Sequence, residues 1–153
     1  MKRIGVMLCA AAVAAGALLS APASAQFAKP EDAIKYRKAA LTLLGAHAGR
    51  IGAVVKGERP FNAAEVQASA AVMETVSGLP WEAFVAGTDK GETRAKPEIW
   101  KDADKFKGAG ESMQKAVAAL SAASKAGNLD QVKAAFGEVG KTCKACHDNF
   151  RKD

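Results

Sequence analysis

Apolar residues recur three or four positions apart from about residue 30 to residue 56, which predicts a first helix. Pro30 lies in its first turn, where a missing N–H costs nothing, and the acids beside it complement the helix dipole. Lys56-Gly57 ends the pattern. The predicted inward positions are Ile34, Leu41, Leu44, Ala48, Ile51 and Val55.

A second helix is predicted to begin after Asn62. Asn62 followed by Glu65 has the pattern of a capping box, and Gly78-Leu79-Pro80 ends the helix. A long loop of roughly residues 80–96 follows. The predicted inward positions of this helix are Val66, Ala70, Met73 and Val76.

A third helix is predicted from Pro97 to about Ala126, where Gly127 provides a C-terminal stop. Its inward positions are Ile99, Phe106, Met113, Val117 and Leu120. We expect both methionines, Met73 and Met113, to fill the core.

A fourth helix follows Asn128, which forms a second capping-box pattern with Gln131. Its inward positions are Leu129, Val132, Phe136, Val139, Cys143, Cys146 and Phe150. Four such helices with short first and third connections predict an all-α fold, an antiparallel up-down four-helix bundle. The two cysteines are in register with the core stripe, so whatever they bind is expected inside the bundle.

The segment Cys143-Lys144-Ala145-Cys146-His147 is a C-x-x-C-H motif, the attachment signature of a c-type haem. Each thiol can form a thioether with a haem vinyl group, and the imidazole of His147 can coordinate the iron. On a helix these three side chains project from one stripe. The motif predicts one covalent haem c per chain, held in the core.

Two other kinds of site share part of this pattern. A thioredoxin-like redox pair lies at a helix N-terminus after a strand, whereas this motif lies deep in a helical pattern. A zinc site needs a fourth ligand, and outside the motif and the N-terminal segment the chain offers only His47. His47 is expected on the flank of the first helix.

The N-terminus has the pattern of a secretory signal peptide. Met1-Lys2-Arg3 is basic, an apolar run too short for a membrane span follows, and Ala23-Ser24-Ala25 is a cleavage site. We expect residues 1–25 to be removed and residues 26–153 to form one periplasmic domain without a membrane span. Losing two basic residues lowers the formal net charge from +6 to +4, with bases and acids interleaved, so nucleic-acid binding is not expected.

A secreted four-helix chain with C-x-x-C-H in its last helix resembles cytochrome c′, the high-spin class II c-type cytochromes. The resemblance covers the whole mature chain. It rests on four segments: Gln26-Phe27-Ala28-Lys29-Pro30-Glu31-Asp32, Leu79-Pro80-Trp81, Pro97-Glu98-Ile99-Trp100, and the run from Cys143 to Arg151.

The resemblance implies which residues surround the haem. It places Leu41 on the side of the iron opposite His147, and the predicted first helix has no Met to act as a sixth ligand. Arg37 and Lys38, one turn earlier, are candidates to pair with a propionate. Arg151 is expected beside the imidazole of His147. The long loop can bring Arg94, with the aromatic residues Trp81 and Phe84, to the haem edge.

A five-coordinate iron beneath an apolar side chain favours nitric oxide and carbon monoxide over oxygen. The expected function is therefore binding of diatomic gases, especially nitric oxide sequestration. The alternative is a one-electron carrier with an unidentified redox partner. No distal His–Arg pair is visible for peroxide cleavage, so an enzyme is not expected. The resemblance also implies a homodimer formed through the outer faces of the first two helices.

Overall fold

The computed structural model describes residues 26–152, and its regular secondary structure is helical. The predicted signal peptide, residues 1–25, lies outside the described part of the chain. In chain order the elements are α1 (Pro30–Val55), α2 (Ala63–Val76), the 3₁₀ helix η2 (Pro80–Ala83), α3 (Glu98–Lys101), α4 (Ala103–Lys125) and α5 (Leu129–Phe150).

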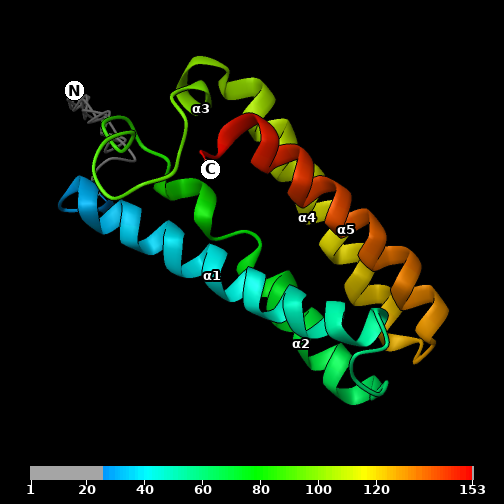
Figure 1. Cartoon of the computed structure of the whole chain (residues 1–153). Coiled ribbons are helices and arrows are strands. Elements are labelled where there is room, and N and C mark those ends of the chain that lie inside the picture. Colours follow the sequence, from blue (N-terminus) through cyan, green and yellow to red (C-terminus); the bar gives the residue numbers. More distant parts are fainter. Residues whose placement is uncertain (1–25, 153) are drawn as a thin grey trace, which may run out of the picture.

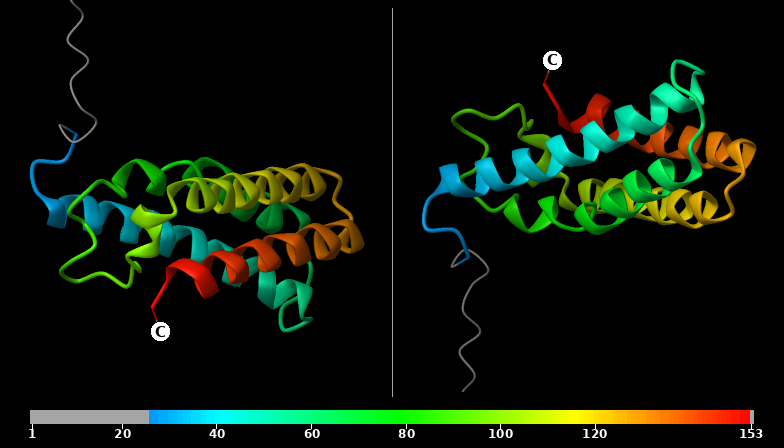
Figure 2. Two further views of the ribbon diagram at one scale, coloured as in Figure 1. Left: turned by 90° about the horizontal axis from the view of Figure 1, so that it is seen from above. Right: turned by 90° about the horizontal axis from the view of Figure 1, so that it is seen from below.

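The four long helices form an antiparallel bundle (Figure 1). Helix α1 packs on α2, α2 packs on α4, and α4 packs on α5, and two further views show the same arrangement (Figure 2). This confirms the predicted four-helix bundle. Within residues 26–152 we find no helix that is both long and apolar enough to cross a membrane.

The predicted helix ends are confirmed by their capping groups. The Asn62 Oδ1 accepts a hydrogen bond from the Glu65 backbone N–H at 3.2 Å, and the Asn128 Oδ1 accepts one from Gln131 at 3.0 Å. Gly127, with φ of 64°, ends α4 in the left-handed region, where a residue with a side chain would be strained.

The prediction of one continuous third helix is wrong. Asp102 has φ of −125° and ψ of 53°, which separates the short α3 from α4. Trp100 on α3 explains the break, because its indole N–H donates to the backbone oxygens of Phe84 (3.0 Å) and Val85 (3.2 Å). Helix α3 is therefore held against the long loop, and the chain turns at Asp102 before it joins the bundle.

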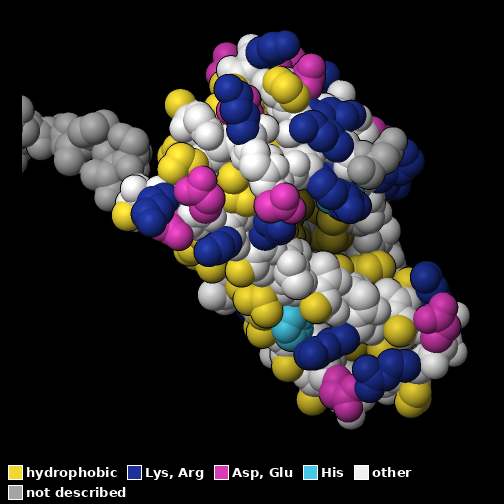
Figure 3. All heavy atoms as spheres, turned by 60° about the vertical axis from the view of Figure 1, so that its left-hand side comes forward, with side chains coloured by type: hydrophobic (Ala, Val, Ile, Leu, Met, Phe, Trp, Pro, Cys, Tyr) yellow, Lys and Arg dark blue, Asp and Glu magenta, His cyan; other side chains and the backbone are white. Residues whose placement is uncertain are grey.

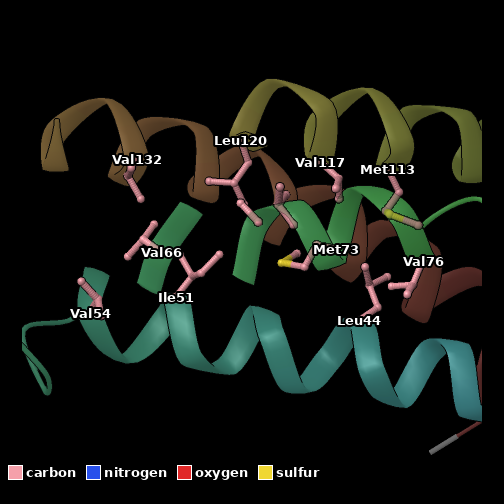
Figure 4. Close-up of a cluster of buried hydrophobic side chains, with 12 residues drawn as sticks. Leu44, Ile51, Val54, Val66, Met73, Val76, Met113, Val117, Leu120 and Val132 are labelled. Atoms are coloured by element: carbon pink, nitrogen blue, oxygen red, sulfur yellow. The ribbon is translucent and has the colours of Figure 1, made fainter. Parts of the chain in front are cut away.

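The main core fills the bundle between α1, α2, α4 and α5 (Figure 4). Met73 and Met113 lie in it, as predicted, with 0% and 5% exposure. Of the predicted inward positions Leu41 is exposed, whereas Ala48, Val55, Leu129 and Phe136 are half-buried and pack against the core. The main core consists of Leu44, Ile51, Val54, Val66, Ala70, Met73, Val76, Met113, Val117, Leu120, Val132 and Val139.

A second, aromatic cluster lies where α5 ends. Its buried members are Ala95, Ile99, Phe106 and Phe150, and the partly buried rings of Trp81, Phe84 and Trp100 pack against them. Trp81 contacts both clusters. Its ring lies so close to α4 that a Cβ on Gly110 would come within 3.1 Å of three ring atoms. Glycine at this position therefore lets the indole pack directly against the helix backbone.

Candidate functional site

Cys143, Cys146 and His147 lie on the last turns of α5. Cys143 packs against the main core, and Cys146 packs against the aromatic cluster. Both cysteines are half-buried and neither forms a disulfide. The motif is therefore placed at the junction of the two apolar clusters, as its register with the core stripe predicted.

The surroundings of the two thiols differ from those of a redox-active pair. Helix α5 begins at Leu129, so the cysteines are far from the N-terminal end whose dipole would favour a thiolate. Burial raises the pKa of the Cys143 thiol, and burial together with the charge of Cys143 raises the pKa of Cys146. Both remain neutral thiols at physiological pH, which argues against a thioredoxin-like site.

A zinc site has no support in the described residues. Within residues 26–152, no group of three or more His, Cys, Asp or Glu side chains is placed to hold a metal ion. The donor set at the motif is two thiols and one imidazole, which suits covalent attachment with a single axial ligand.

His147 is an exposed residue whose ring nitrogens both lie 3.3 Å from the Arg151 Nη1. Partial desolvation lowers the pKa of His147, and the positive charges of Arg151 and Arg94 lower it further, against an opposite effect of Asp148. The imidazole is therefore neutral at pH 7, which is the form that has a free lone pair for a metal ion.

The long loop is pinned to the end of α5 by backbone hydrogen bonds. The Lys96 N–H donates to the Phe150 oxygen at 2.9 Å, the Lys152 N–H donates to the Arg94 oxygen at 2.8 Å, and Ala95 forms an isolated β-bridge with Arg151. This pairing brings Arg94, which the sequence assigned to the haem edge, close to His147. The sequence carries no local signal for this pairing.

Arg37 is buried, with 2% exposure, and points into the long loop. Its Nη1 donates to the Ala83 oxygen (3.1 Å) and the Thr88 Oγ1 (2.6 Å). Its Nη2 donates to the Thr88 oxygen (2.6 Å) and the Thr93 Oγ1 (2.8 Å). Burial lowers the pKa of Arg37 to about 10, so it remains charged. All four terminal N–H groups are engaged, and only the Nε–H is left for the propionate that the sequence analysis expected.

Arg37 also lies over two aromatic rings, 4.5 Å from the centroid of Phe84 and 5.8 Å from that of Trp100. The guanidinium of Arg37 therefore contacts η2, α3 and the segment between them, and it holds these three parts of the chain together. Thr88 and Thr93 could not be predicted as partners of Arg37, because no sequence pattern distinguishes these threonines from exposed ones.

Lys38 and Leu41 lie on the same half of α1 and are both exposed. The Lys38 Nζ donates to the Glu92 oxygen at 3.2 Å, so it reaches the long loop but not its interior. Within residues 26–152, Leu41 is one of three large apolar side chains that remain exposed, at 40%. An exposed leucine on a helix otherwise directed at the core is available to contact a bound apolar group.

Helices α1 and α5 meet near one end and separate toward the motif. At Gly52 a Cβ would lie 3.3 Å from the Phe136 ring, whereas the first half of α1 and the last turns of α5 diverge (Figure 1). The space-filling view shows a hollow with a hydrophobic floor and basic side chains along its rim (Figure 3). Half-buried thiols, a neutral imidazole and exposed apolar surface at this end of the bundle fit a haem group.

Comparison with known proteins agrees with this site. The sequence model of the family described as Cytochrome C' matches residues 32–151. Cytochrome c′ from Alcaligenes xylosoxydans is 54% identical over 127 residues, covering 83% of this chain and 98% of that protein. The crystal structure of cytochrome c′ from Rubrivivax gelatinosus, 48% identical, superposes with a TM-score of 0.80 and covers 83% of this chain and 100% of that one.

Two further solved structures carry gas ligands. A leucine-to-alanine variant of the Alcaligenes xylosoxidans cytochrome c′ in complex with nitric oxide is 53% identical, has a TM-score of 0.78, and covers 83% of this chain and 98% of that one. A leucine-to-glycine variant of the same protein with carbon monoxide bound also has a TM-score of 0.78, with 53% identity and coverage of 83% and 99%. The chain therefore belongs to the cytochrome c′ family, whose members carry covalently bound haem c.

Proposed function

We propose that Cys143 and Cys146 hold the haem through thioether bonds and that His147 is its single axial ligand. The observation that carries this proposal is the position of the two thiols, one against the main core and the other against the aromatic cluster. A haem joined to both sulfur atoms would be held by residues at the junction of these clusters, where it would cover apolar surface. The neutral imidazole of His147 supplies the iron ligand from α5.

We propose that the protein binds small diatomic gases and sequesters nitric oxide. The bound haem supplies an iron centre that accepts such a gas as a ligand. Leu41 presents an apolar side chain opposite His147 and has no N–H or O–H to stabilise bound oxygen. Nitric oxide and carbon monoxide need no such donor, and relatives with either gas bound support the proposal.

Arg151 and the long loop position the reacting groups in this proposal. Arg151 lies against both ring nitrogens of His147, and one of these contacts must be released for that nitrogen to bind the iron. The positive charge of Arg151 reduces the basicity of the imidazole. Arg37 fixes the loop that carries Arg94. We propose a binding protein and not an enzyme. Peroxide cleavage would need a histidine on the side of the haem opposite His147, and the other histidine of the described chain, His47, instead lines the groove between α1 and α2.

An optical titration tests the gas-binding function. Purified ferrous protein is expected to show a five-coordinate, high-spin spectrum that changes on addition of nitric oxide or carbon monoxide and does not change on addition of imidazole, which is much larger than either gas. A six-coordinate, low-spin ferrous spectrum without added ligand would contradict the proposal. That outcome would favour the one-electron carrier, because constant coordination keeps the reorganisation energy low.

We propose that the protein acts in the periplasm after removal of residues 1–25. The support is the basic start, apolar run and Ala23-Ser24-Ala25 site of the sequence. Mass spectrometry of protein from a periplasmic extract is expected to find Gln26 as the first residue. Protein that retains Met1 in the cytoplasmic fraction would contradict this.

We also propose a homodimer formed through the outer faces of α1 and α2. A groove of about 360 Å³ lies between these helices, with His47, Arg50 and Val72 among its lining residues. Leu43 on α1 is 49% exposed, and a second copy would cover it. Leu43→Glu is expected to give monomers in sedimentation experiments, and an unchanged dimer would place the interface elsewhere.

A further inference from the structure

The groove between α1 and α2 is separate from the haem-binding residues of α5. Its volume is about 360 Å³, and on each helix its lining residues lie three or four positions apart. The floor is formed by Ile51, Val54 and Val66, which belong to the main core and have 1%, 7% and 2% exposure (Figure 4). A hollow of this size with an apolar floor suits a small organic ligand.

His47, which lines this groove, has one ring nitrogen without a partner. Its Nδ1 is buried and has no hydrogen-bond partner. A buried N–H without an acceptor costs more free energy than a bare lone pair, so the proton of the neutral ring belongs on Nε2. The Nε2–H is therefore the hydrogen-bond donor that His47 can present to a ligand.

Ser69 is a second unpaired polar group of the groove. Four serines are buried in the described part of the chain, Ser69, Ser77, Ser121 and Ser124. The Ser77 hydroxyl donates to the Glu74 backbone oxygen (2.8 Å), that of Ser121 to the Glu74 carboxylate (2.5 Å), and that of Ser124 to the Ser121 oxygen (2.7 Å). Within residues 26–152 the Ser69 hydroxyl has no such bond, although Ser69 is only 6% exposed and lines the groove. Because buried hydroxyls are normally paired, an acceptor in the groove would satisfy it.

The charged side chains of the groove leave one positive charge without a counter-charge. Arg59 and Glu65 both line it and pair with each other at 3.2 Å, so their charges cancel. The adjoining pair Lys56–Glu58, at 3.9 Å, is neutral as well. Arg50 lines the groove, is exposed, and forms no ion pair within residues 26–152. The groove therefore combines an apolar floor with an unpaired guanidinium.

We propose that this groove binds a small amphipathic carboxylate. The apolar body of the ligand covers Ile51 and Val66, and its carboxylate accepts hydrogen bonds from Arg50, the His47 Nε2–H and the Ser69 hydroxyl. An ionised carboxylate has only acceptor oxygens, which matches these donors, and its bond to the guanidinium is charge-assisted. A cationic ligand would instead meet the unpaired charge of Arg50.

The homodimer proposed above uses the same face of the bundle. A second copy related by a two-fold axis would bring the same net positive charge to this face, whereas a carboxylate neutralises it. We therefore assign the groove to the carboxylate and the contact between copies to Leu43, which is not among the groove-lining residues. Measurements on the Leu43→Glu variant as well as the native protein separate the two occupants.

Isothermal titration calorimetry with octanoate tests the proposal. Arg50→Gln is expected to weaken octanoate binding about tenfold, because it removes the charge-assisted hydrogen bond. The control Lys133→Gln removes the same charge from an exposed position of α5 and is expected to change the affinity less than about twofold. Ala68→Phe, at an exposed position of the groove, is expected to abolish binding by filling the hollow. Ala71→Phe, exposed on α2 and not among the groove-lining residues, is expected to preserve it.

Further titrations decide between the possible occupants and sites. Binding of octanoate by Leu43→Glu alone would support the ligand site and show that a second copy covers it, whereas no binding by either protein would overturn the proposal. Equal weakening by Arg50→Gln and Lys133→Gln, or equal affinity for octanoate, 1-octanol and octylammonium, would also overturn it. Carbon monoxide bound to the ferrous protein is expected to leave the octanoate affinity unchanged. Loss of octanoate binding under carbon monoxide would place the ligand at the haem, which overturns the groove site and leaves gas binding intact.

Discussion

Where α4 turns into α5, Leu120, Val117 and Val132 are fully buried at 0% exposure, whereas at the other end of α5 His147 is exposed and both cysteines are half-buried. The first end is closed by aliphatic side chains from neighbouring helices. The second end is organised by the buried guanidinium of Arg37 and the aromatic rings around it. The comparison separates the part of the bundle that is stable by packing from the part that is shaped for a cofactor.

The two ends also use polar groups differently. In the main core no ionisable side chain is among the buried members, while Arg37 brings a charge into the interior beside the aromatic cluster. Such a charge is tolerated because every terminal N–H has an acceptor. The loop that Arg37 holds also pairs with the end of α5 and places Arg94 near His147. The side chains at this less closely packed end are therefore fixed by hydrogen bonds.

The largest effect is expected from removing both attachment points. The double variant Cys143→Ala, Cys146→Ala loses the haem and the contacts it makes with both clusters, and we expect a loss of several kcal/mol in the free energy of unfolding. Thermal unfolding followed by circular dichroism measures it. The control Lys144→Ala, an exposed residue between the cysteines, is expected to keep the haem. If the double variant unfolds with the same thermal midpoint as the native protein, the haem is peripheral to the core.

The same substitution at the two ends sharpens the comparison. Leu120→Ala is expected to cost about 2–5 kcal/mol in the free energy of unfolding, because it leaves a cavity in a closed core. Its carbon monoxide association rate is expected to stay near that of the native protein. Leu41→Ala is expected to raise that rate about tenfold, which corresponds to about 1.4 kcal/mol of activation free energy. Stopped-flow mixing measures both, and equal rates in the two variants would mean that Leu41 does not cover the iron.

Arg37 provides the next test. Arg37→Gln removes most of the donors that hold Ala83, Thr88 and Thr93, and we expect a cost of about 1–3 kcal/mol in urea unfolding, with faster proteolysis of the loop. Its neighbour Lys38 is exposed, so Lys38→Gln is expected to change stability by less than about 0.5 kcal/mol. Similar effects of the two substitutions would show that the hydrogen bonds of Arg37 do not organise this end.

The smallest effect concerns two glycines of α4. A methyl group at Gly110 would lie 3.1 Å from the Trp81 ring, whereas nothing lies within 4 Å of the same position at Gly108. Gly110→Ala is expected to destabilise the protein by about 1 kcal/mol, since overpacking outweighs the gain in helix propensity. Gly108→Ala is expected to stabilise it by up to about 1 kcal/mol. Thermal unfolding of both variants checks the opposite signs.

The bundle and the motif were predictable from the sequence because both depend on local patterns. Helical spacing and the Asn62 and Asn128 caps located the long helices, and the spacing of Cys143, Cys146 and His147 specified the chemistry. The break at Asp102 was not predictable, since it follows from hydrogen bonds between Trp100 and a loop distant in sequence.

The surroundings of the motif were harder to predict for the same reason. Arg37 has the sequence context of a surface base, and its burial depends on Thr88 and Thr93 more than fifty residues later. The charges are interleaved along the chain, yet folding brings Lys96 to the Asp148 backbone oxygen and Lys105 to the Asn149 side chain on α5. Contacts between remote segments leave no periodic trace in a single sequence.

The central claim is that this end of the bundle holds a haem through the two thiols of α5. Mass spectrometry of the peptide that contains Cys143 to His147, prepared from the native protein, tests it most directly. The account predicts a mass increase of one haem that survives extraction with acidified acetone. Two free thiols, a disulfide or a bound zinc ion in that peptide would contradict it.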